Sequence, residues 1–404
     1  MRRFALGFGL LAIVLSSNAQ NQYFNQQLLP LGDESALLAN SGIAGQSPNS
    51  AVIFNPAALV LNTGNSFSFS GNAYFEFEYT AEGAASLGGE SIDLNASGLQ
   101  FMPTSLIYHL DKWGWNFSFA LCVPNYLDYT GEERFESASG SPFNKLNITE
   151  GVKESLYSGF LGAGKDLGEG WSLGFSIYGN YYSYSNIIVI EQFSTGNPAD
   201  FYLYNGYQEA ESYSLGAMFG LLKQWESLRL GLTLTSPNLN LFAQGVDRGS
   251  TSIAGTNSIP KFTSYETNDV KTHLSNGARI GFGIDYKIGT KLEWSADFNY
   301  FGAQSQGLFP ASQAGEASYR ASTGFKYSIN SNSVSYLGFA YLPSSKNGSQ
   351  RETTVLTAGS RLRIGRTLNS VGVFFANSSE ELLNGSAQFD YFGIMIGSTV
   401  DLDF

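Results

Sequence analysis

The residues that could support catalysis or metal binding are few and far apart in this sequence. The only histidines are His109 and His273, and the only cysteine is Cys122. A zinc site needs several closely placed ligands, and a serine hydrolase needs a histidine beside its nucleophile. Neither histidine has such a neighbour along the chain. We therefore predict no catalytic residues, no metal site, no cofactor and no enzymatic activity, with a lipase as the enzyme alternative.

Charges at alternating positions in the C-terminal half are the second set of chemically capable residues. Such charges could satisfy one another as an internal network of ion pairs, since charges shielded from water need partners. Alternatively, one or two of the arginines could hold the carboxylate of a ligand. Both interpretations stay open from the sequence, and the set comprises Arg229, Arg279, Glu293, Asp297, Arg320, Lys326, Arg361 and Arg363.

Long alternating strands are the elements that must position these charges. In residues 66–79 the odd-numbered positions, beginning with Phe67 and Phe69, form one face. The even-numbered positions, from Ser66 and Ser68 to Glu76 and Glu78, form the other face. This period of two over the whole stretch predicts one apolar and one polar face of a strand. Its length exceeds that of most strands in soluble domains, and a tilted strand crossing a bilayer needs roughly 9–11 residues. The length favours a membrane strand.

The same alternation recurs, and connections of two kinds separate the repeats. It returns at 115–123, 171–178, 228–234, 280–286 and 292–300. Short turns are predicted at 111–114, 166–170, 224–227, 288–291, 330–332 and 366–370, and longer loops near 80–96, 124–153, 193–209, 237–271, 303–316, 343–352 and 377–386. Short turns at one end and long loops at the other are typical of outer-membrane barrels. We therefore predict an all-β fold, a fourteen-stranded antiparallel transmembrane β-barrel.

Both ends of the chain and the tryptophans agree with this fold. Arg2 and Arg3 precede an apolar run and a small-residue cleavage site, which predicts a signal peptide at 1–19. No later segment has the ~18 consecutive apolar residues of a membrane helix. The net charge of −12 disfavours a nucleic-acid partner. All five tryptophans lie near predicted short turns, which indicates a periplasmic interface, and Phe404 ends an alternating strand.

Residues 20–64 do not alternate and predict short helices. Asp33 is a plausible N-cap, and Asn55 followed by Pro56 and Ala57 is a second helix start, because asparagine caps free N–H groups and proline suits the first helical position. The segment is too apolar for a free tail in water. We therefore predict a mainly helical hatch at 20–64 inside the lumen of a barrel at 65–404.

Two stretches resemble the FadL/TodX family of outer-membrane channels for hydrophobic compounds. "SGIAGQSPNSAVIFNPAAL" at 41–59 is similar to that family's N-terminal hatch, with its motif at Asn55, Pro56 and Ala57. "PTSLIYHLDKWGWNFSFALCVPNY" at 103–126 is similar to its second hairpin. The resemblance covers the whole mature chain in length and strand number.

The resemblance implies passive uptake of hydrophobic or amphiphilic small molecules, either long-chain fatty acids or aromatic hydrocarbons, across the outer membrane. The cargo would enter an apolar lumen and leave through a lateral opening where one strand kinks inward, although no kink residue stands out within 113–123. A monomer is expected, surrounded by lipid and lipopolysaccharide and inserted by the outer-membrane insertion machinery. A PorV-like component of a type IX protein secretion system, which would bind secreted proteins at its outer loops, shares the architecture and is the alternative.

Candidate ligand contacts follow from the resemblance and from strand alternation. The apolar tail of a cargo would contact hatch residues and inward wall residues, and its head group would meet inward arginines. The candidates are Ile53, Phe54, Leu59, Phe160, Met218, Arg279 and Arg320.

Overall fold

The structure of this chain is a computed structural model. It describes residues 29–62, 64–87, 90–136, 145–193, 201–255, 258–268, 277–303, 316–346, 349–382 and 385–402. The predicted signal peptide at 1–19, the first residues of the predicted hatch at 20–28, His273 and Phe404 lie outside these ranges.

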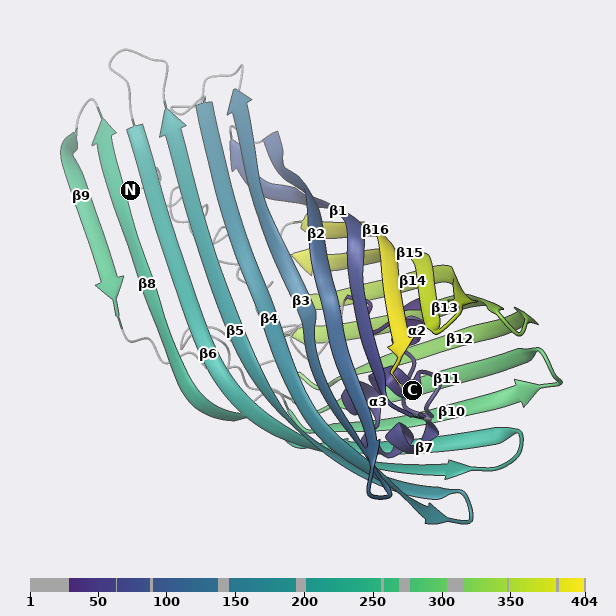
Figure 1. The fold of residues 1–404 in the computed structure, drawn as a ribbon. Helices are drawn as coiled ribbons and strands as arrows, with labels where there is room; N and C mark the ends of the chain where they lie inside the picture. The colour runs from purple at the N-terminus through teal and green to yellow at the C-terminus, as the bar shows by residue number, and fades with distance from the viewer. Residues whose placement is uncertain are drawn as a thin grey trace.

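A single antiparallel sheet closes on itself into a barrel with fourteen strand positions, as predicted (Figure 1). The ring runs from β1 to β7, continues from β10 to β16, and closes where β16 pairs with β1. The ring strands are β1 (Ser66–Leu87), β2 (Glu90–Lys112), β3 (Trp115–Glu136), β4 (Lys145–Gly168), β5 (Trp171–Phe193), β6 (Phe201–Gln224), β7 (Leu228–Thr235), β10 (Arg279–Ile288), β11 (Leu292–Phe301), β12 (Ser318–Asn330), β13 (Ser333–Lys346), β14 (Ser349–Ile364), β15 (Thr367–Leu382) and β16 (Gly385–Asp401). Closure leaves the ring without a free edge, which is what a membrane-spanning sheet requires.

Two further strands, β8 (Leu239–Gly255) and β9 (Ser258–Thr267), extend the wall beyond β7. The C-terminal part of β6 pairs with β7, and its N-terminal part pairs with β8. β7 and β8 therefore lie one after the other along the same edge of β6. Pro237 lies between them and cannot donate a ladder hydrogen bond. The interruption explains why this wall contains more segments than barrel positions.

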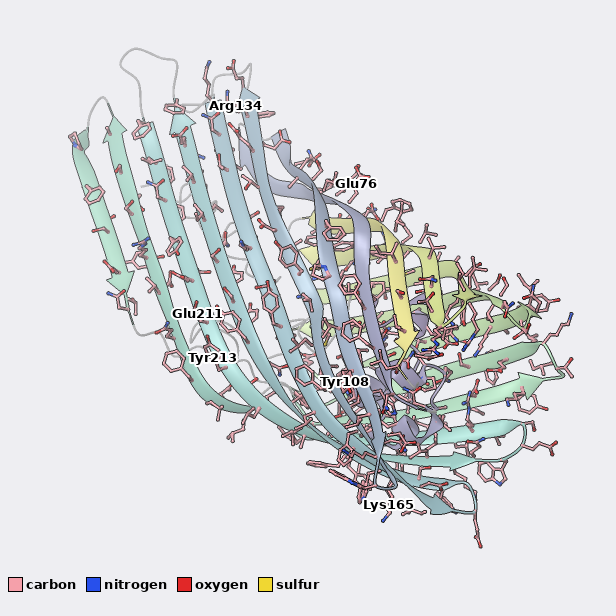
Figure 2. All side chains as sticks on the ribbon, viewed as in Figure 1. Glu76, Tyr108, Arg134, Lys165, Glu211 and Tyr213 are labelled. Atoms are coloured by element: carbon pink, nitrogen blue, oxygen red, sulfur yellow. The ribbon has the colours of Figure 1, made fainter. Side chains whose placement is uncertain are left out.

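The outer face carries an apolar band bounded by aromatic side chains. Tyr157, Tyr181, Tyr213 and Phe242 lie opposite one another on β4, β5, β6 and β8, with neighbouring ring centroids 4.8–6.2 Å apart. Trp171 lies about ten residues away along β5, which for a tilted strand matches the ~25 Å band between the aromatic girdles of such barrels. Figure 2 shows Tyr213 between the short-turn end, marked by Lys165, and the far end, marked by Arg134.

Beyond this aromatic row the strands continue into a polar extension, and the predicted long loops are wrong there. Residues predicted as the loop at 124–153 belong largely to β3 and β4, and the outer face carries the exposed ion pair of Lys153 and Asp128. Tyr129 and Tyr204, predicted to lie in outer loops, are buried strand residues. The alternation inverts once a strand leaves the membrane, because its outer face then meets water while its inner face still packs, as Leu146, Ile148 and Val152 of β4 do.

A bulge in β1 reverses its two faces and corrects a second prediction. The register with β16 shifts between Asn72 and Tyr74, so one residue is extra on β1. Glu76 then pairs with Phe392, whose side chain is exposed on the outer face, and Glu76 is exposed as well (Figure 2). The prediction that Glu76 and Glu78 share the inner face with Ser66 is therefore wrong.

The described part of the N-terminal segment, residues 29–62, lies within the barrel and is called the inner segment (Figure 1). It consists of loops and four short helices, namely α2 (Glu34–Leu37), the 3-10 helix η2 (Pro48–Ser50), α3 (Ala51–Phe54) and the 3-10 helix η3 (Pro56–Leu61). Almost all its side chains up to Leu59 are buried, and it contacts β2–β6 on one side and β13–β15 on the other. In the described ranges, no helix is long and apolar enough to cross a membrane.

Candidate functional site

The inner segment and the wall next to it build one apolar cluster. Ile53, Phe54 and Leu59 of the inner segment share this cluster with Phe160 of β4 and Met218 of β6. The structure therefore brings together the five apolar residues predicted as ligand contacts, although their contact with a ligand stays a prediction. Wall residues that the sequence analysis did not single out complete the cluster, among them Ile107, Ala120, Cys122, Tyr178 and Leu222.

The Asn55 side chain connects the inner segment to the wall. Its Oδ1 accepts from the N–H of Ala57 at 3.0 Å, which caps η3. Its Nδ2 donates to the carbonyl of Ile43 at 2.7 Å and to the carbonyl of Leu221 on β6 at 3.2 Å. Since Pro56 stands at the first helical position and has no N–H to satisfy, the motif closes the start of η3 completely.

Glycines of the wall make this close approach geometrically feasible. A Cβ on Gly220 would lie 2.1 Å from Asn55 Oδ1, and a Cβ on Gly174 would lie 2.2 Å from the carbonyl carbon of Pro56. No real side chain tolerates such distances, so only glycine allows the inner segment to touch the sheet here. The sequence shows these glycines as ordinary strand residues, and only the position of the inner segment explains them.

The two predicted head-group arginines have different surroundings. Arg320 is buried and donates from Nη2 to the carbonyl of Ala39 at 2.5 Å. It also attracts Asp297, whose Oδ2 accepts from the N–H groups of Gly42 at 2.7 Å and Ile43 at 3.0 Å. Arg320 therefore holds the inner segment, and its role toward a ligand stays a prediction.

Arg279 lies nearer the apolar cluster. Its Nε donates to Thr235 at 3.3 Å, and its charge interacts with the Tyr178 hydroxyl of the cluster. Within the described residues it forms no ion pair. The structure thus places Arg279 beside Tyr178 of the apolar cluster, whereas Arg320 contacts Ala39 of the inner segment.

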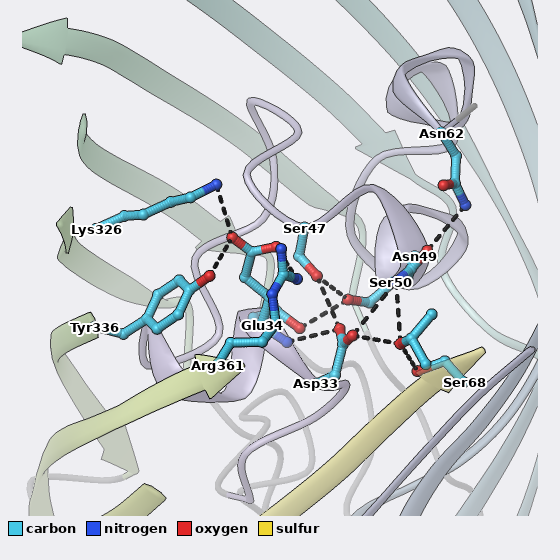
Figure 3. A network of polar contacts seen from close by, with 12 residues as sticks. Asp33, Glu34, Ser47, Asn49, Ser50, Asn62, Ser68, Lys326, Tyr336 and Arg361 are labelled. Carbon is cyan, nitrogen blue, oxygen red and sulfur yellow. Dashed lines mark hydrogen bonds and ion pairs between the residues drawn. The ribbon is translucent and has the colours of Figure 1, made fainter. Parts of the chain in front are cut away.

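Glu34 is the centre of the polar network that fixes the inner segment (Figure 3). Its carboxylate lies 2.6 Å from Arg361 and 3.0 Å from Lys326, and it accepts a 3.0 Å hydrogen bond from Tyr336. Burial alone would raise the pKa of Glu34, but Arg361 and Lys326 outweigh this effect and lower it to about 2. Three strands of the wall, β12, β13 and β14, thereby bind one carboxylate of the inner segment.

The ion pairs continue around the wall and confirm the predicted internal network for Arg229, Glu293, Lys326 and Arg361, whereas Arg363 pairs with Asp401 at an exposed position. Lys326 is 3.7 Å from Glu293, and Glu293 is 3.9 Å from Arg229, which pairs closely with Asp285. The sequence analysis missed Glu34 and Asp285. Glu34 directly follows the predicted N-cap Asp33, but nothing in its local sequence indicates partners on distant strands.

Asp33 binds the same region of the wall, at β16, two strands from β14. It caps α2 by accepting from the N–H of Glu34 at 2.6 Å, as its predicted N-cap position implies. Thr399 of β16 donates to its other carboxylate oxygen at 2.6 Å, and Asn49 donates to the same oxygen at 3.4 Å. The two adjacent acids therefore tie one short helix to the wall between β12 and β16 (Figure 3).

Strands β2 and β3 separate partway along the wall. Their pairing runs from Lys112↔Trp115 to Ser105↔Cys122, and no further pair joins them within the described residues. The β3–β4 register shifts between Cys122 and Asn125, a stretch that contains Pro124. Beyond the last pair, β2 still exposes Phe101 on the outer face at 66%. Cys122 lies opposite Ser158, the neighbour of Tyr157, so the separation begins at the outer aromatic row, and Cys122 links it to the apolar cluster.

No arrangement of catalytic or metal-binding side chains occurs in the described ranges. His109 is buried on β2, and no group of three or more His, Cys, Asp or Glu is placed to hold a metal ion there. Cys122 is buried in the apolar cluster.

The fold of this chain is similar to that of solved channels for hydrophobic compounds. No protein-family model and no curated protein matches the sequence. Similar solved structures include the toluene transporter TodX of Pseudomonas putida (TM-score 0.66, 13% identity, 93% of this chain and 100% of that one) and the toluene transporter TbuX of Ralstonia pickettii (0.62, 15%, 93% and 99%). A FadL homologue of Pseudomonas aeruginosa is also similar (0.57, 12%, 92% and 98%). The predicted FadL/TodX resemblance is confirmed at the level of the fold.

Proposed function

We propose that this chain is an outer-membrane channel for the passive uptake of hydrophobic or amphiphilic small molecules. The observation that carries the proposal is the position of the apolar cluster beside the separation of β2 and β3. Cys122 belongs to the cluster and also forms the last pair before the two strands part. A hydrophobic molecule that displaces side chains in this cluster reaches the membrane by a short lateral path.

The energetics suit such a cargo. Each Å² of apolar surface removed from water contributes roughly 25 cal/mol, and an exit into lipid avoids returning that surface to water. The inner segment blocks the straight route to the periplasm through its contacts with both halves of the wall. The toluene transporters with this fold support aromatic hydrocarbons as candidates, and the FadL homologue leaves long-chain fatty acids as the other class.

Uptake by cells tests the proposal. The chain is expressed in a Gram-negative host that lacks its own hydrophobic channel, and the entry of labelled toluene and labelled oleate is measured against the empty vector. We expect faster entry of at least one of them. If cells with the barrel take up toluene and oleate no faster than cells with the empty vector, although the barrel is present and heat-modifiable on gels, uptake is contradicted. Secreted proteins recovered with the barrel instead would favour the PorV-like alternative.

A further inference from the structure

The outer part of the lumen contains buried oxygen atoms that lack hydrogen-bond donors. Within the described residues, Glu150 Oε1, Asn186 Oδ1 and Gln208 Oε1 have no partner and are hidden from solvent. A buried acceptor without a donor costs about 1–3 kcal/mol. Three of them close together therefore call for an explanation in terms of function.

The strand register places these acceptors side by side. Asn186 of β5 lies opposite Val152 of β4 on one side and opposite Gln208 of β6 on the other. Glu150 is two residues from Val152 on the same face of β4, which also carries the interior residues Ile148 and Val152. The acceptors thus form one patch across three strands, here called the acceptor patch (Glu150, Asn186 and Gln208).

The acceptor patch lies on the route that a cargo from outside would follow. All three residues are beyond the outer aromatic row of Tyr157, Tyr181 and Tyr213, in the part of the barrel that extends above the membrane. Apolar side chains surround it, including Ile190 and Tyr204 of the interior cluster. A molecule bound there would keep its apolar part against these residues and its polar group against the oxygens.

Charge distinguishes which polar group fits. Glu154, the next acid on this face of β4, accepts from Asn125 at 3.1 Å and is close enough to Arg351 to interact with its charge. Arg351 also donates to Ser378 at 2.6 Å and lies over the Phe389 ring. Glu150 has a hydrogen bond from Tyr129 and no cation beside it among the described residues. Burial raises the pKa of Glu150 to about 7 and that of Glu154 to about 8. A cation bound beside Glu150 would lower its pKa again and hold it as an ionised counter-ion.

We propose that the acceptor patch binds the ammonium group of an amphiphilic primary amine, with Glu150 as its counter-ion. An ammonium offers three N–H donors and one positive charge, whereas a carboxylate offers only further acceptors. This inference rests on the proposed uptake function and names a class of cargo for it. The proposal rests mainly on Glu150, because both oxygens of an ionised carboxylate are acceptors. This holds whichever way the amides of Asn186 and Gln208 are oriented.

Binding of four ligands with the same aromatic part tests the inference. Phenethylamine, 2-phenylethanol, ethylbenzene and 3-phenylpropanoate are titrated at pH 8, above the raised pKa of Glu150, against the full chain in lipid nanodiscs by equilibrium dialysis. We expect phenethylamine to bind about tenfold or more tighter than ethylbenzene and 3-phenylpropanoate, as a charged hydrogen bond implies. The isosteric variant Glu150→Gln should lose about tenfold in amine affinity and keep its affinity for ethylbenzene.

Glu132→Gln provides the matched control, because it removes an equal charge from an exposed position on β3. It should leave all four affinities unchanged. If ethylbenzene binds but phenethylamine binds no more tightly than 3-phenylpropanoate, the acceptor patch is not an amine site. The same conclusion follows if Glu150→Gln leaves the affinity for phenethylamine unchanged. If none of the four binds, the uptake function itself is contradicted, and this inference with it.

Discussion

The carboxylate of Glu34 lies 2.6 Å from the guanidinium of Arg361, and this buried pair joins the inner segment to the barrel wall. The two residues are separated by most of the chain, so the contact forms only when the barrel has closed around the inner segment. Lys326 and Tyr336 complete the environment of the same carboxylate. The position of the inner segment therefore depends strongly on Glu34.

Glu34→Gln should loosen the inner segment without unfolding the barrel. The substitution leaves Arg361 and Lys326 buried without their anion, and breaking a buried pair in this way typically costs about 3–5 kcal/mol. We expect larger single-channel conductance in planar bilayers and faster proteolysis of the N-terminal region. Glu226→Gln, at an exposed short turn, is the control and should conduct like the parent. Parental conductance for Glu34→Gln would show that this network does not hold the segment.

Acid should release the inner segment in the same way. The folded pKa of Glu34 is lowered to about 2, whereas an unperturbed glutamate titrates near 4.3. A lowered folded pKa contributes stability that is fully present above the unfolded value and is lost as pH falls through the folded value. Conductance that depends on Glu34 should therefore stay low at pH 7 and 5 and rise between about pH 4 and 2. In Glu34→Gln this component of the acid response should be absent.

The alternating membrane strands and the general fold were predictable from the sequence, whereas the full length of the strands and the contacts of the inner segment were not. Alternation at Phe67 and Phe69 or at Trp171 and Leu173 reports a lipid-facing surface, and such a pattern is local. Glu34 and its partners on β12–β14 depend on closure of the ring, which no local pattern encodes. The outer part of β4 was missed because its alternation is inverted there, with Leu146, Ile148 and Val152 on the inner face and polar residues on the outer face.

The separation of β2 and β3 was also not predictable from local sequence patterns. The strand predicted at 113–123 ends one residue before Pro124, so the sequence predicts no kink residue within it. In the structure β3 continues to Glu136, and the irregularity at Pro124 falls in its interior. A proline inside a strand is a strong local signal only when the strand bounds are known.

Gly174→Ala should displace the inner segment through a steric clash. The new Cβ would lie 2.2 Å from the carbonyl carbon of Pro56, so either η3 or β5 must move. We expect higher conductance and greater sensitivity of the host to large antibiotics. Gly159→Ala is the matched control, since its Cβ meets Leu121 at an ordinary 3.4 Å. Equal sensitivity of the two variants would mean that the inner segment does not press on the wall at Gly174.

Two substitutions at Asn55 separate helix capping from attachment to the wall. Asn55→Asp keeps an oxygen for the N–H of Ala57 but loses the donor to Ile43 and Leu221, whereas Asn55→Ala loses both. Loss of a cap costs about 1 kcal/mol, and each buried carbonyl left without a donor costs about 1–3 kcal/mol. If attachment dominates, both variants should conduct more than the parent and to a similar degree. Parental behaviour of Asn55→Asp would leave capping as the sole role.

Closing the separation between β2 and β3 tests lateral uptake most directly. Extending their register by one step places Thr104 beside Val123. Thr104→Cys with Val123→Cys, in a Cys122→Ser background, should therefore allow a disulfide across the opening. Leu110→Cys with Phe117→Cys, an already paired position, gives a control disulfide in the same background. We predict that oxidation, verified by mass spectrometry, abolishes uptake of the transported hydrophobe in the first variant only, and that a reductant restores it. Undiminished uptake through the cross-linked opening would contradict lateral exit between β2 and β3.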